Sequence, residues 1–253
     1  MGMLEGKVTL IIGASTQAGI GAATGARFVR EGATVVLSAR RLAEATAVAN
    51  SIGASALACD LTRETDIEAL VRGVVDQHGA LHALVLVAGA HGSQTVDQLT
   101  RDTLLRCFEL NVIGPATAIK YAARAMTAGG SIIYISSAAA ELNTVGVAAY
   151  GATKAAGERL MEVAALEYAP RGIRINTVAP GMLVTEMSAA AMQRPGFRDA
   201  FERETPLGRL ASVDEVAAAT TWLASDDCFT TGDRIRVAGG VHLRRHPMPE
   251  DFK

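Results

Sequence analysis

Short apolar runs alternate with helical patterns along nearly the whole chain, and this alternation limits the fold more than any single motif. The runs are rich in β-branched residues and apolar on both alternations, as strands buried on both faces of a parallel sheet are. They are residues 7–12, 33–38, 55–59, 83–87, 131–136, 173–178 and 234–238. Helix-like stretches lie near 20–31, 41–52, 64–78, 97–126, 149–169 and 212–224. Such alternation predicts βαβ units and a parallel sheet covered by helices on both faces.

The 253 residues are expected to form one domain, because α/β sheets often reach about 250 residues as one unit. The sequence has no linker, repeat or low-complexity tract. The expected division is a cofactor half over about 1–130 and a catalytic and substrate half over about 131–253. Residues 182–210 interrupt the rhythm with a long, Pro-containing insertion after a strand, where a substrate lid is expected.

Composition excludes several classes of function. A net charge of −2 gives no strong field to recruit nucleic acid or an anionic membrane. No apolar run reaches the roughly 18 residues of a membrane span, and the first residues lack the pattern of a secretory signal. Cys59, Cys107 and Cys228 show neither a disulfide framework nor a zinc-binding spacing. We therefore expect a reduced, cytoplasmic location.

A glycine-rich turn, "IIGASTQAGIGAATGARF" (11–28), follows the first expected strand and opens the first expected helix. Gly13, Gly19 and Gly21 allow a sharp turn and a close approach of the backbone to an anion. The helix that follows offers free N–H groups and the positive end of its dipole to a pyrophosphate. The alternative is a tight turn with no ligand. The spacing between Gly13 and Gly19 is two residues longer than expected for this motif.

The end of the second expected strand bears on the choice of cofactor. An enzyme that prefers NAD has an acidic residue there for the ribose 2′-hydroxyl, but this chain has Ala39 followed by Arg40. A guanidinium beside an uncharged residue suits a 2′-phosphate. Alternatively, Arg40 and Arg41 are only the solvated start of a helix. Asp60 either accepts a hydrogen bond from adenine or caps the helix near 64.

Tyr150 and Lys154 stand four residues apart in "AAYGATKAAG" (148–157), so they share one helix face. Lowering a phenol pKa by about three units takes roughly 4 kcal/mol. An ammonium about 4 Å away supplies most of that at an effective dielectric near 20. Lys154 could thus make Tyr150 a general acid and base. The alternative is a buried tyrosine and a surface lysine at a common spacing.

Two further places support an acid/base site. Ser137 ends the fifth expected strand, at the carboxyl edge where ligands bind, and could donate to a substrate oxygen. Pro115 lacks an N–H and leaves the carbonyl of Asn111 without its helical donor. A water bound there could link Asn111 to Lys154 as a proton relay. The alternative is a kinked, solvated helix.

Together these motifs resemble the short-chain dehydrogenase/reductase family, in its compact form of about 250 residues, along essentially the whole chain. The matching stretches are the turn at 13–21, "CDL" at 59–61, "AGA" at 88–90, Asn111, Ser137, Y-x-x-x-K at 150–154, "NTVAPG" at 176–181 and "TTGDRIRVAGG" at 230–240. The resemblance implies a doubly wound, seven-stranded Rossmann-type sheet. It implies a catalytic tetrad of Asn111, Ser137, Tyr150 and Lys154, in which Tyr150 exchanges a proton with the substrate, Ser137 holds the substrate oxygen and Lys154 also binds the nicotinamide ribose.

The motifs and the resemblance also give a set of cofactor contacts, with Pro180, Gly181, Leu183 and Thr185 lining the nicotinamide half. The full set is Gly13, Ser15, Gly19, Ile20, Gly21, Arg40, Arg41, Asp60, Leu61, Ala88, Gly89, Tyr150, Lys154, Pro180, Gly181, Leu183 and Thr185. The family usually forms tetramers in which the helices near 97–126 and 149–169 pair across an interface. We therefore expect a homotetramer or homodimer.

The sequence thus indicates an NADP(H)-dependent oxidoreductase that interconverts a secondary alcohol and a ketone, with NAD(H) as the other possible cofactor. Ala138, Ala139, Leu142 and Val145, with Met182, Met187 and Met192, suggest an apolar small-molecule substrate. A 3-oxoacyl-thioester reductase of fatty-acid type is an alternative. A catalytically idle dinucleotide sensor and a methyltransferase are rivals from other classes, but neither needs Y-x-x-x-K.

Three departures from the family pattern concern loop shape and stability rather than reaction type. They are the longer glycine-rich turn, Leu86-Val87 in place of Asn-Asn, and Ala238 in place of Asp. His242 and His246 have a metal-like spacing but no third ligand, so no metal is expected. His91 either faces the substrate or is a plain loop histidine.

Overall fold

The computed structural model describes residues 2–252, which form one sheet of seven parallel strands in the order β3-β2-β1-β4-β5-β6-β7. The strands are β1 (Val8–Ile12), β2 (Thr34–Ala39), β3 (Ser55–Ala58), β4 (Ala83–Leu86), β5 (Gly130–Ile135), β6 (Ile173–Pro180) and β7 (Arg234–Val237). All seven expected strands are present, and the doubly wound fold is confirmed. The order reverses between β1 and β4, so their carboxyl ends form the crevice where such sheets bind ligands.

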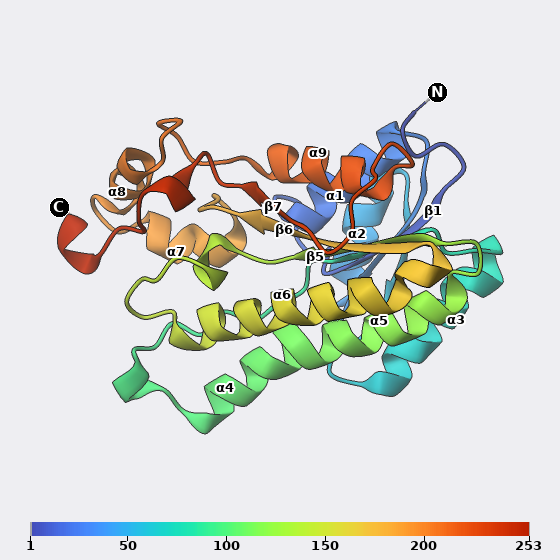
Figure 1. The fold of residues 1–253 in the computed structure, drawn as a ribbon, viewed down its shortest axis with the longest axis horizontal. Coiled ribbons are helices and arrows are strands. Elements are labelled where there is room, and N and C mark those ends of the chain that lie inside the picture. Colours follow the sequence, from blue (N-terminus) through green and yellow to red (C-terminus); the bar gives the residue numbers. More distant parts are fainter. Residues whose placement is uncertain (1, 253) are drawn as a thin grey trace.

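Helices cover both faces of the sheet (Figure 1). They are α1 (Ile20–Arg30), α2 (Leu42–Ile52), α3 (Glu64–His78), α4 (Arg101–Phe108), α5 (Gly114–Ala125), α6 (Ala148–Tyr168), α7 (Ala189–Met192), α8 (Phe197–Glu204) and α9 (Val213–Ala224). One core cluster joins the sheet to α3, α5 and α6, and a second joins it to α1, α2 and α9. Strand residues therefore alternate between two buried faces, which explains their continuous apolar runs.

The single helix expected over 97–126 is interrupted. The chain forms α4, then the π-helical turn η2 (Glu109–Ile113), then α5. The N–H of Gly114 donates to the carbonyl of Glu109, five residues earlier. Pro115 at the start of α5 has no N–H to donate. The helical hydrogen bonds therefore span five residues instead of four here, and the Asn111 carbonyl is left free for another partner.

Residues 182–210, the segment where a lid is expected, follow β6. This segment contains a short turn η5 (Glu186–Ser188), α7 and α8. An isolated parallel bridge pairs Leu183 with Ala211, so both ends of the lid are pinned together. The C-terminal residues fold against α8, where Phe252 stacks on Phe197 with ring centroids 5.1 Å apart. Figure 1 shows α7, α8 and the C-terminal end grouped at one end of the molecule.

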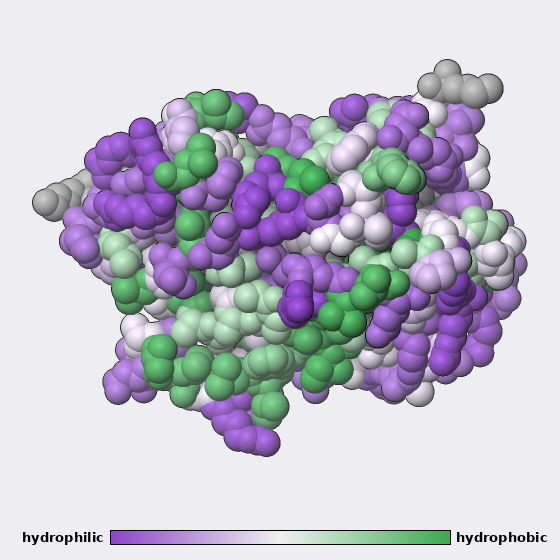
Figure 2. All heavy atoms as spheres, viewed as in Figure 1, coloured by the Kyte–Doolittle hydropathy of each residue, from purple (hydrophilic) through white to green (hydrophobic). Residues whose placement is uncertain are grey.

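One part of the surface carries an apolar patch. Figure 2 shows hydrophobic side chains gathered over α4 and the start of α6. Exposed apolar residues on this layer include Leu105, Phe108, Ile113, Val163 and Leu166, of which Leu166 is 79% exposed. None of the described helices combines the length and apolar character that crossing a membrane requires.

Candidate active site

The residues expected to form the site all follow the carboxyl ends of strands or lie in helices beside them. Gly13 and Ser15 follow β1, Gly19 is the N-cap of α1, and Ile20 and Gly21 begin that helix. The remaining positions are Arg40 and Arg41 after β2, Asp60 and Leu61 after β3, Ala88 and Gly89 after β4, Asn111 in η2, Ser137 after β5, Tyr150 and Lys154 in α6, Pro180 at the end of β6, and Gly181, Leu183 and Thr185 beyond it. Because parallel strands end at one edge, the fold brings this set to one side of the sheet.

The glycine-rich turn is a close-packed cradle that only glycine permits. Gly13 has a φ of 107°, and a Cβ there would lie 2.3 Å from the nitrogen of Ala88. A Cβ on Gly21 would lie 2.6 Å from the Gly13 carbonyl oxygen. These approaches join the turn after β1 to the segment after β4, across the point where the strand order reverses. The longer turn therefore keeps the close backbone approach that a pyrophosphate site requires.

The N-terminus of α1 fits an anion. Gly19 caps it without a side-chain hydrogen bond, and the first turn holds no acidic residue. The backbone N–H groups and the helix dipole therefore face the turn without a competing carboxylate. The extra residues of the turn are anchored on α2, where the Gln17 side chain accepts a hydrogen bond from the hydroxyl of Ser51 at 3.2 Å.

The adenosine end of the site carries exposed charges. Arg40 and Arg41 are both exposed, and Nη2 of Arg41 donates to Oγ of Ser15 at 3.3 Å. Asp60 does not cap α3, whose N-cap is Arg63. Its carboxylate accepts bonds from the backbone and hydroxyl of Thr62, and these, with a smaller contribution from Arg40, hold the pKa of Asp60 below its usual value. The capping alternative is thus wrong.

Ser137, Tyr150 and Lys154 come together at the other end of the site. We call this the chemical end, because proton exchange with a substrate is expected there. Oγ of Ser137 accepts from the Ala139 backbone at 3.1 Å. Burial raises the pKa of Tyr150, and the Ser137 hydroxyl opposes this by a smaller amount. Burial also lowers the pKa of Lys154 to about 7. The Lys154 Nζ lies 5.9 Å from the centroid of the Tyr150 ring. Burial therefore outweighs the direct effect of the lysine on the phenol that the spacing suggested.

Asn111 holds the neighbouring backbone through its side chain. Its Oδ1 accepts from the N–H of Ala90 at 2.9 Å, and its Nδ2 donates to the Ala90 carbonyl and to Oγ1 of Thr153 at the same distance. A Cβ on Gly89 would lie 2.7 Å from Asn111 Oδ1 and 3.4 Å from Lys154 Nζ. These contacts lock the segment after β4 against both η2 and α6.

The backbone carbonyl of Asn111, where the sequence suggested a bound water, has a partner within the chain. The Tyr134 hydroxyl on β5 donates to it at 2.9 Å. Pro115 does leave this carbonyl without its helical donor, as expected, but a buried phenol provides the bond. The sequence argument missed Tyr134 because its position in an apolar strand reads as core. The signal in the sequence was that the Asn111 carbonyl has no helical donor and must find another hydrogen-bond donor nearby.

Two further charged residues were missed. Glu158 lies one helical turn beyond Lys154, and its carboxylate is 3.2 Å from Nε of Arg234 on β7. Arg234 also donates to the Ser137 carbonyl at 3.2 Å and to the carboxylate of Glu141 at 2.6 Å. Burial raises the pKa of Glu158, against the smaller opposing effects of Ser136 and Arg234. The i,i+4 continuation from Tyr150 through Lys154 to Glu158 was the signal in the sequence.

His91 lies beside Tyr150, and the centroids of the two rings are 4.7 Å apart. Its Nδ1 is 2.9 Å from Oγ of Ser93, and burial lowers the pKa of His91, so the imidazole is neutral at neutral pH. Of the pair with metal-like spacing, His246 packs against Phe201 instead, with ring centroids 5.7 Å apart. Within residues 2–252, no group of three or more His, Cys, Asp or Glu side chains could hold a metal ion.

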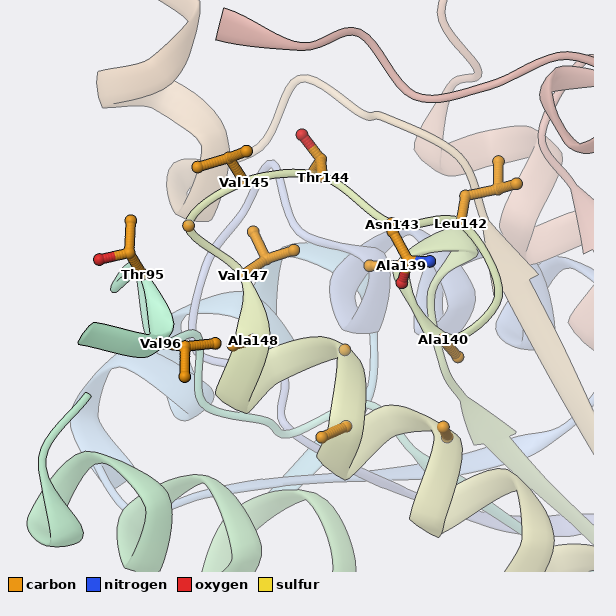
Figure 3. A pocket seen from close by; sticks show the side chains of 14 residues that line it. Thr95, Val96, Ala139, Ala140, Leu142, Asn143, Thr144, Val145, Val147 and Ala148 are labelled. Atoms are coloured by element: carbon orange, nitrogen blue, oxygen red, sulfur yellow. The ribbon is translucent and has the colours of Figure 1, made fainter. Parts of the chain in front are cut away.

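A cavity of about 530 Å³ lies between the loop after β5, the start of α6 and the segment around Thr95 (Figure 3). Its walls are the loop 139–147, Thr95 and Val96, and positions 148, 151, 152 and 155 of α6. These helical positions face away from Tyr150 and Lys154. Of the four residues expected to form an apolar wall, Ala139, Leu142 and Val145 line this cavity, whereas Ala138 packs against Ala238 and Val241. Met182 and Met192 pack within the lid, and Met187 is exposed.

The sheet order, the strand-to-helix glycine cradle and the α1 terminus without a side-chain cap are features of the doubly wound α/β class to which dinucleotide-binding proteins belong. A family model described as enoyl-(acyl carrier protein) reductase matches residues 13–242. A protein named as an uncharacterized oxidoreductase of Methylorubrum extorquens is 36% identical over 95% of this chain and 100% of its own length. The L-fucose dehydrogenase of Oryctolagus cuniculus is 34% identical over 96% of this chain and 87% of its own.

A solved structure agrees with these relatives. A short-chain type dehydrogenase/reductase from Mycobacterium ulcerans matches with a TM-score of 0.92 and 32% identity, covering 96% of this chain and 92% of that one. The chain therefore belongs to the short-chain dehydrogenase/reductase family of oxidoreductases.

Proposed function

We propose that this protein is an NADP(H)-dependent oxidoreductase that interconverts a secondary alcohol and a ketone. The observation that carries the proposal is the convergence of Ser137, Tyr150 and Lys154 beside Gly89 and Asn111, at the carboxyl edge of the sheet. A hydroxyl, a phenol and a buried ammonium at this place suit the reduction of a carbonyl group. A binding protein without turnover has no use for this arrangement.

The division of work follows from the contacts. Ser137 holds the substrate oxygen as negative charge develops on it. Tyr150, whose pKa is raised by burial, is protonated at neutral pH and acts as the acid in reduction. In the oxidation direction Tyr150 is the base, and the ammonium of Lys154 stabilises the phenolate. A pKa of about 7 lets Lys154 itself exchange a proton near neutrality. When bound, the nicotinamide supplies or accepts the hydride.

We propose that the cofactor contacts are those expected from the sequence. The Gly13–Gly21 cradle and the α1 terminus suit the pyrophosphate, and Pro180, Gly181, Leu183 and Thr185 follow β6 on the nicotinamide side. Preference for NADP(H) is supported by Arg40 and Arg41, both exposed, and by Ala39 in place of an acid. The Ser15 hydroxyl, 3.3 Å from Arg41, adds a donor to the same corner. NAD(H) is the alternative cofactor.

The substrate is proposed to be a small apolar ketone or alcohol, since Ala139, Leu142 and Val145 make the segment that follows Ser137 apolar. A 3-oxoacyl-thioester reductase is the second candidate, favoured by the name of the matching family model, which refers to an acyl carrier protein. Among the relatives, the L-fucose dehydrogenase is named for a sugar. These names point to different classes of substrate, so the experiment has to compare several classes.

The proposal includes a homotetramer, or a homodimer, in the cytoplasm. The exposed apolar residues over α4, η2 and α6 support self-association through the helices that the family resemblance names. The three cysteines are buried and unpaired, which suits a reducing compartment. Light scattering after size exclusion tests the assembly directly.

A panel of ketones, alcohols, sugars and 3-oxoacyl thioesters, assayed at 340 nm with both nicotinamides, tests the function. We expect turnover that prefers NADPH, and we expect Tyr150→Phe to remove it while NADPH binding stays within several-fold. An active Tyr150→Phe variant would contradict the acid/base role. Binding of both nicotinamides without turnover of any compound would favour the idle sensor.

A further inference from the structure

Tyr134 is held in one orientation beneath the acid/base site. The side chain is fully buried, and its hydroxyl donates to the Asn111 carbonyl at 2.9 Å. Gly157 on α6 makes room for it, because a Cβ there would lie 2.6 Å from the Tyr134 hydroxyl and 3.0 Å from that same carbonyl. The phenol therefore fills the opening that the π-helical turn creates, and its ring cannot rotate away.

The ring of Tyr134 lies close to the Lys154 ammonium. Nζ is 4.7 Å from the centroid of Tyr134, compared with 5.9 Å from that of Tyr150. Nζ also donates to the Ile135 carbonyl at 2.8 Å, which fixes its distance from β5. Lys154 is only 3% exposed, so few water molecules stabilise its charge. An aromatic face at this distance attracts an ammonium, and the attraction is strongest at desolvated sites.

We propose that Tyr134 is a positioning residue for Lys154: its ring face favours the charged form of the lysine, and its bond to Asn111 holds the ring in place. The catalytic consequence rests on the proposed function, since Lys154 is expected to stabilise the Tyr150 phenolate. The effect on Lys154 itself does not depend on any substrate.

The other groups near Lys154 define the background for a test. On α6 these are Tyr150 and Glu158, and the carboxylate of Glu158 also favours the ammonium. Arg234 on β7 shares that carboxylate at 3.2 Å, which weakens its effect on the lysine. From the segment after β4, Gly89 approaches Nζ and carries no charge. Cys107 on α4 affects the pKa of Tyr150 and not the pKa of Lys154. None of these groups changes when residue 134 is substituted.

Lysine NMR gives a direct readout, because the chain has only Lys7, Lys120, Lys154 and Lys253. Protein labelled at lysine Cε would be titrated, with Lys154→Met identifying the signal. We expect Tyr134→Leu, which removes the ring, to lower the Lys154 pKa by about half to one unit. Tyr134→Phe keeps the ring and loses the hydroxyl, so it should leave this pKa within about 0.3 units of the wild type.

If Tyr134→Leu does not fold, a series of phenylalanine analogues at residue 134 provides a second test of the ring. Phenylalanines with one, two and five ring fluorines at residue 134 keep nearly the same shape while the ring face becomes less negative. The Lys154 pKa should fall in that order. An unchanged pKa across the series, or a shift with Tyr134→Phe as large as with Tyr134→Leu, would overturn the proposal.

Enzyme kinetics supply the second arm. If the wild type turns over, the acidic limb of the pH profile of kcat for alcohol oxidation should move to higher pH in Tyr134→Leu and stay in place in Tyr134→Phe. A limb that moves as far in Tyr134→Phe as in Tyr134→Leu would assign the effect to the hydroxyl, which both variants lack, and contradict the ring role. If the wild type turns over nothing, the proposed function fails, whereas the NMR result for Lys154 stands on its own.

Discussion

The two ends of the candidate cofactor site handle positive charge in opposite ways. At the adenosine end, Arg40 and Arg41 are exposed, and Arg41 contacts Ser15 and Glu44 at 3.3 and 3.5 Å. At the chemical end, Lys154 is 3% exposed and is surrounded by a carbonyl, an aromatic ring and Glu158. An exposed cation keeps its charge in water and can adapt to a ligand. A buried cation keeps its charge only as far as its neighbours allow.

This difference predicts where the chain tolerates change. Substitutions at the adenosine end should alter which ligand binds and leave the fold alone. Substitutions at the chemical end should alter chemistry, stability and pH dependence together, because the same contacts serve all three. The following tests separate the two ends, from the largest expected effect to the smallest.

The strongest test concerns Ser137. We expect Ser137→Ala to lower kcat by about 100- to 1000-fold, because a hydrogen bond to the reacting oxygen is lost. Steady-state kinetics with the best substrate would measure it. Ser131→Ala is the matched control, because this hydroxyl lies at the other end of β5 and donates to the Leu223 carbonyl at 2.8 Å. That variant should lose stability and keep kcat. Equal kcat losses in both would remove the special role of Ser137.

The pH dependence of stability tests the buried charge. The pKa of Lys154 falls from an ordinary 10.5 to about 7 in the fold. Between these values the unfolded chain binds more protons than the folded one, so this residue makes stability rise with pH across that window. Denaturant unfolding of the wild type and of Lys154→Met from pH 7 to 10 should show the wild type gaining relative to the variant. Parallel curves would mean that burial does not lower the pKa of Lys154.

Glycine substitutions test the packing at the chemical end. Gly157→Ala places a Cβ 2.6 Å from the Tyr134 hydroxyl, so we expect a loss of about 1–3 kcal/mol in the free energy of unfolding. Gly73→Ala on α3 is the control, because its Cβ would meet only the Leu57 side chain at 3.5 Å. That change should be neutral or stabilise by up to about 1 kcal/mol. Similar effects at both positions would show that Tyr134 is free to move.

The smallest expected effect lies at the adenosine end. We expect Arg40→Ala to raise the KM for NADPH about tenfold, which corresponds to about 1.4 kcal/mol, and to change the KM for NADH little. Arg30→Ala, an exposed arginine at the far end of α1, is the control for a general loss of positive charge. A rise of equal size for both nicotinamides would contradict a phosphate-binding role.

The fold could be predicted because buried parallel strands and their crossover helices leave clear patterns in the chain. The expected strand at 83–87 differs from β4 by one residue, and the expected helix at 64–78 coincides with α3. The helix expected over 97–126 was wrong as a single element. Proline is visible in the sequence, but whether a ladder kinks, widens or ends depends on what packs against it.

The site could be predicted only in part, because motif residues carry their chemistry in the sequence and supporting residues do not. Tyr150 and Lys154 were identified from their spacing and identity. Tyr134 and Arg234 depend on strand register and on which face of the sheet each side chain occupies, which no local pattern gives. The distance between Lys154 and Tyr150, and with it the balance between burial and charge, also required the structure.

The parallel bridge between Leu183 and Ala211 has an evolutionary consequence. Closing a loop costs little more as the loop grows, so the stretch between these anchors can lengthen, shorten or change composition cheaply. Ser137, Tyr150 and Lys154, the proposed acid/base residues, lie outside these anchors, whereas Thr185, a proposed nicotinamide contact, lies between them. A lineage of such proteins could therefore change its substrate by substitutions between these anchors, while keeping the proposed acid/base residues unchanged.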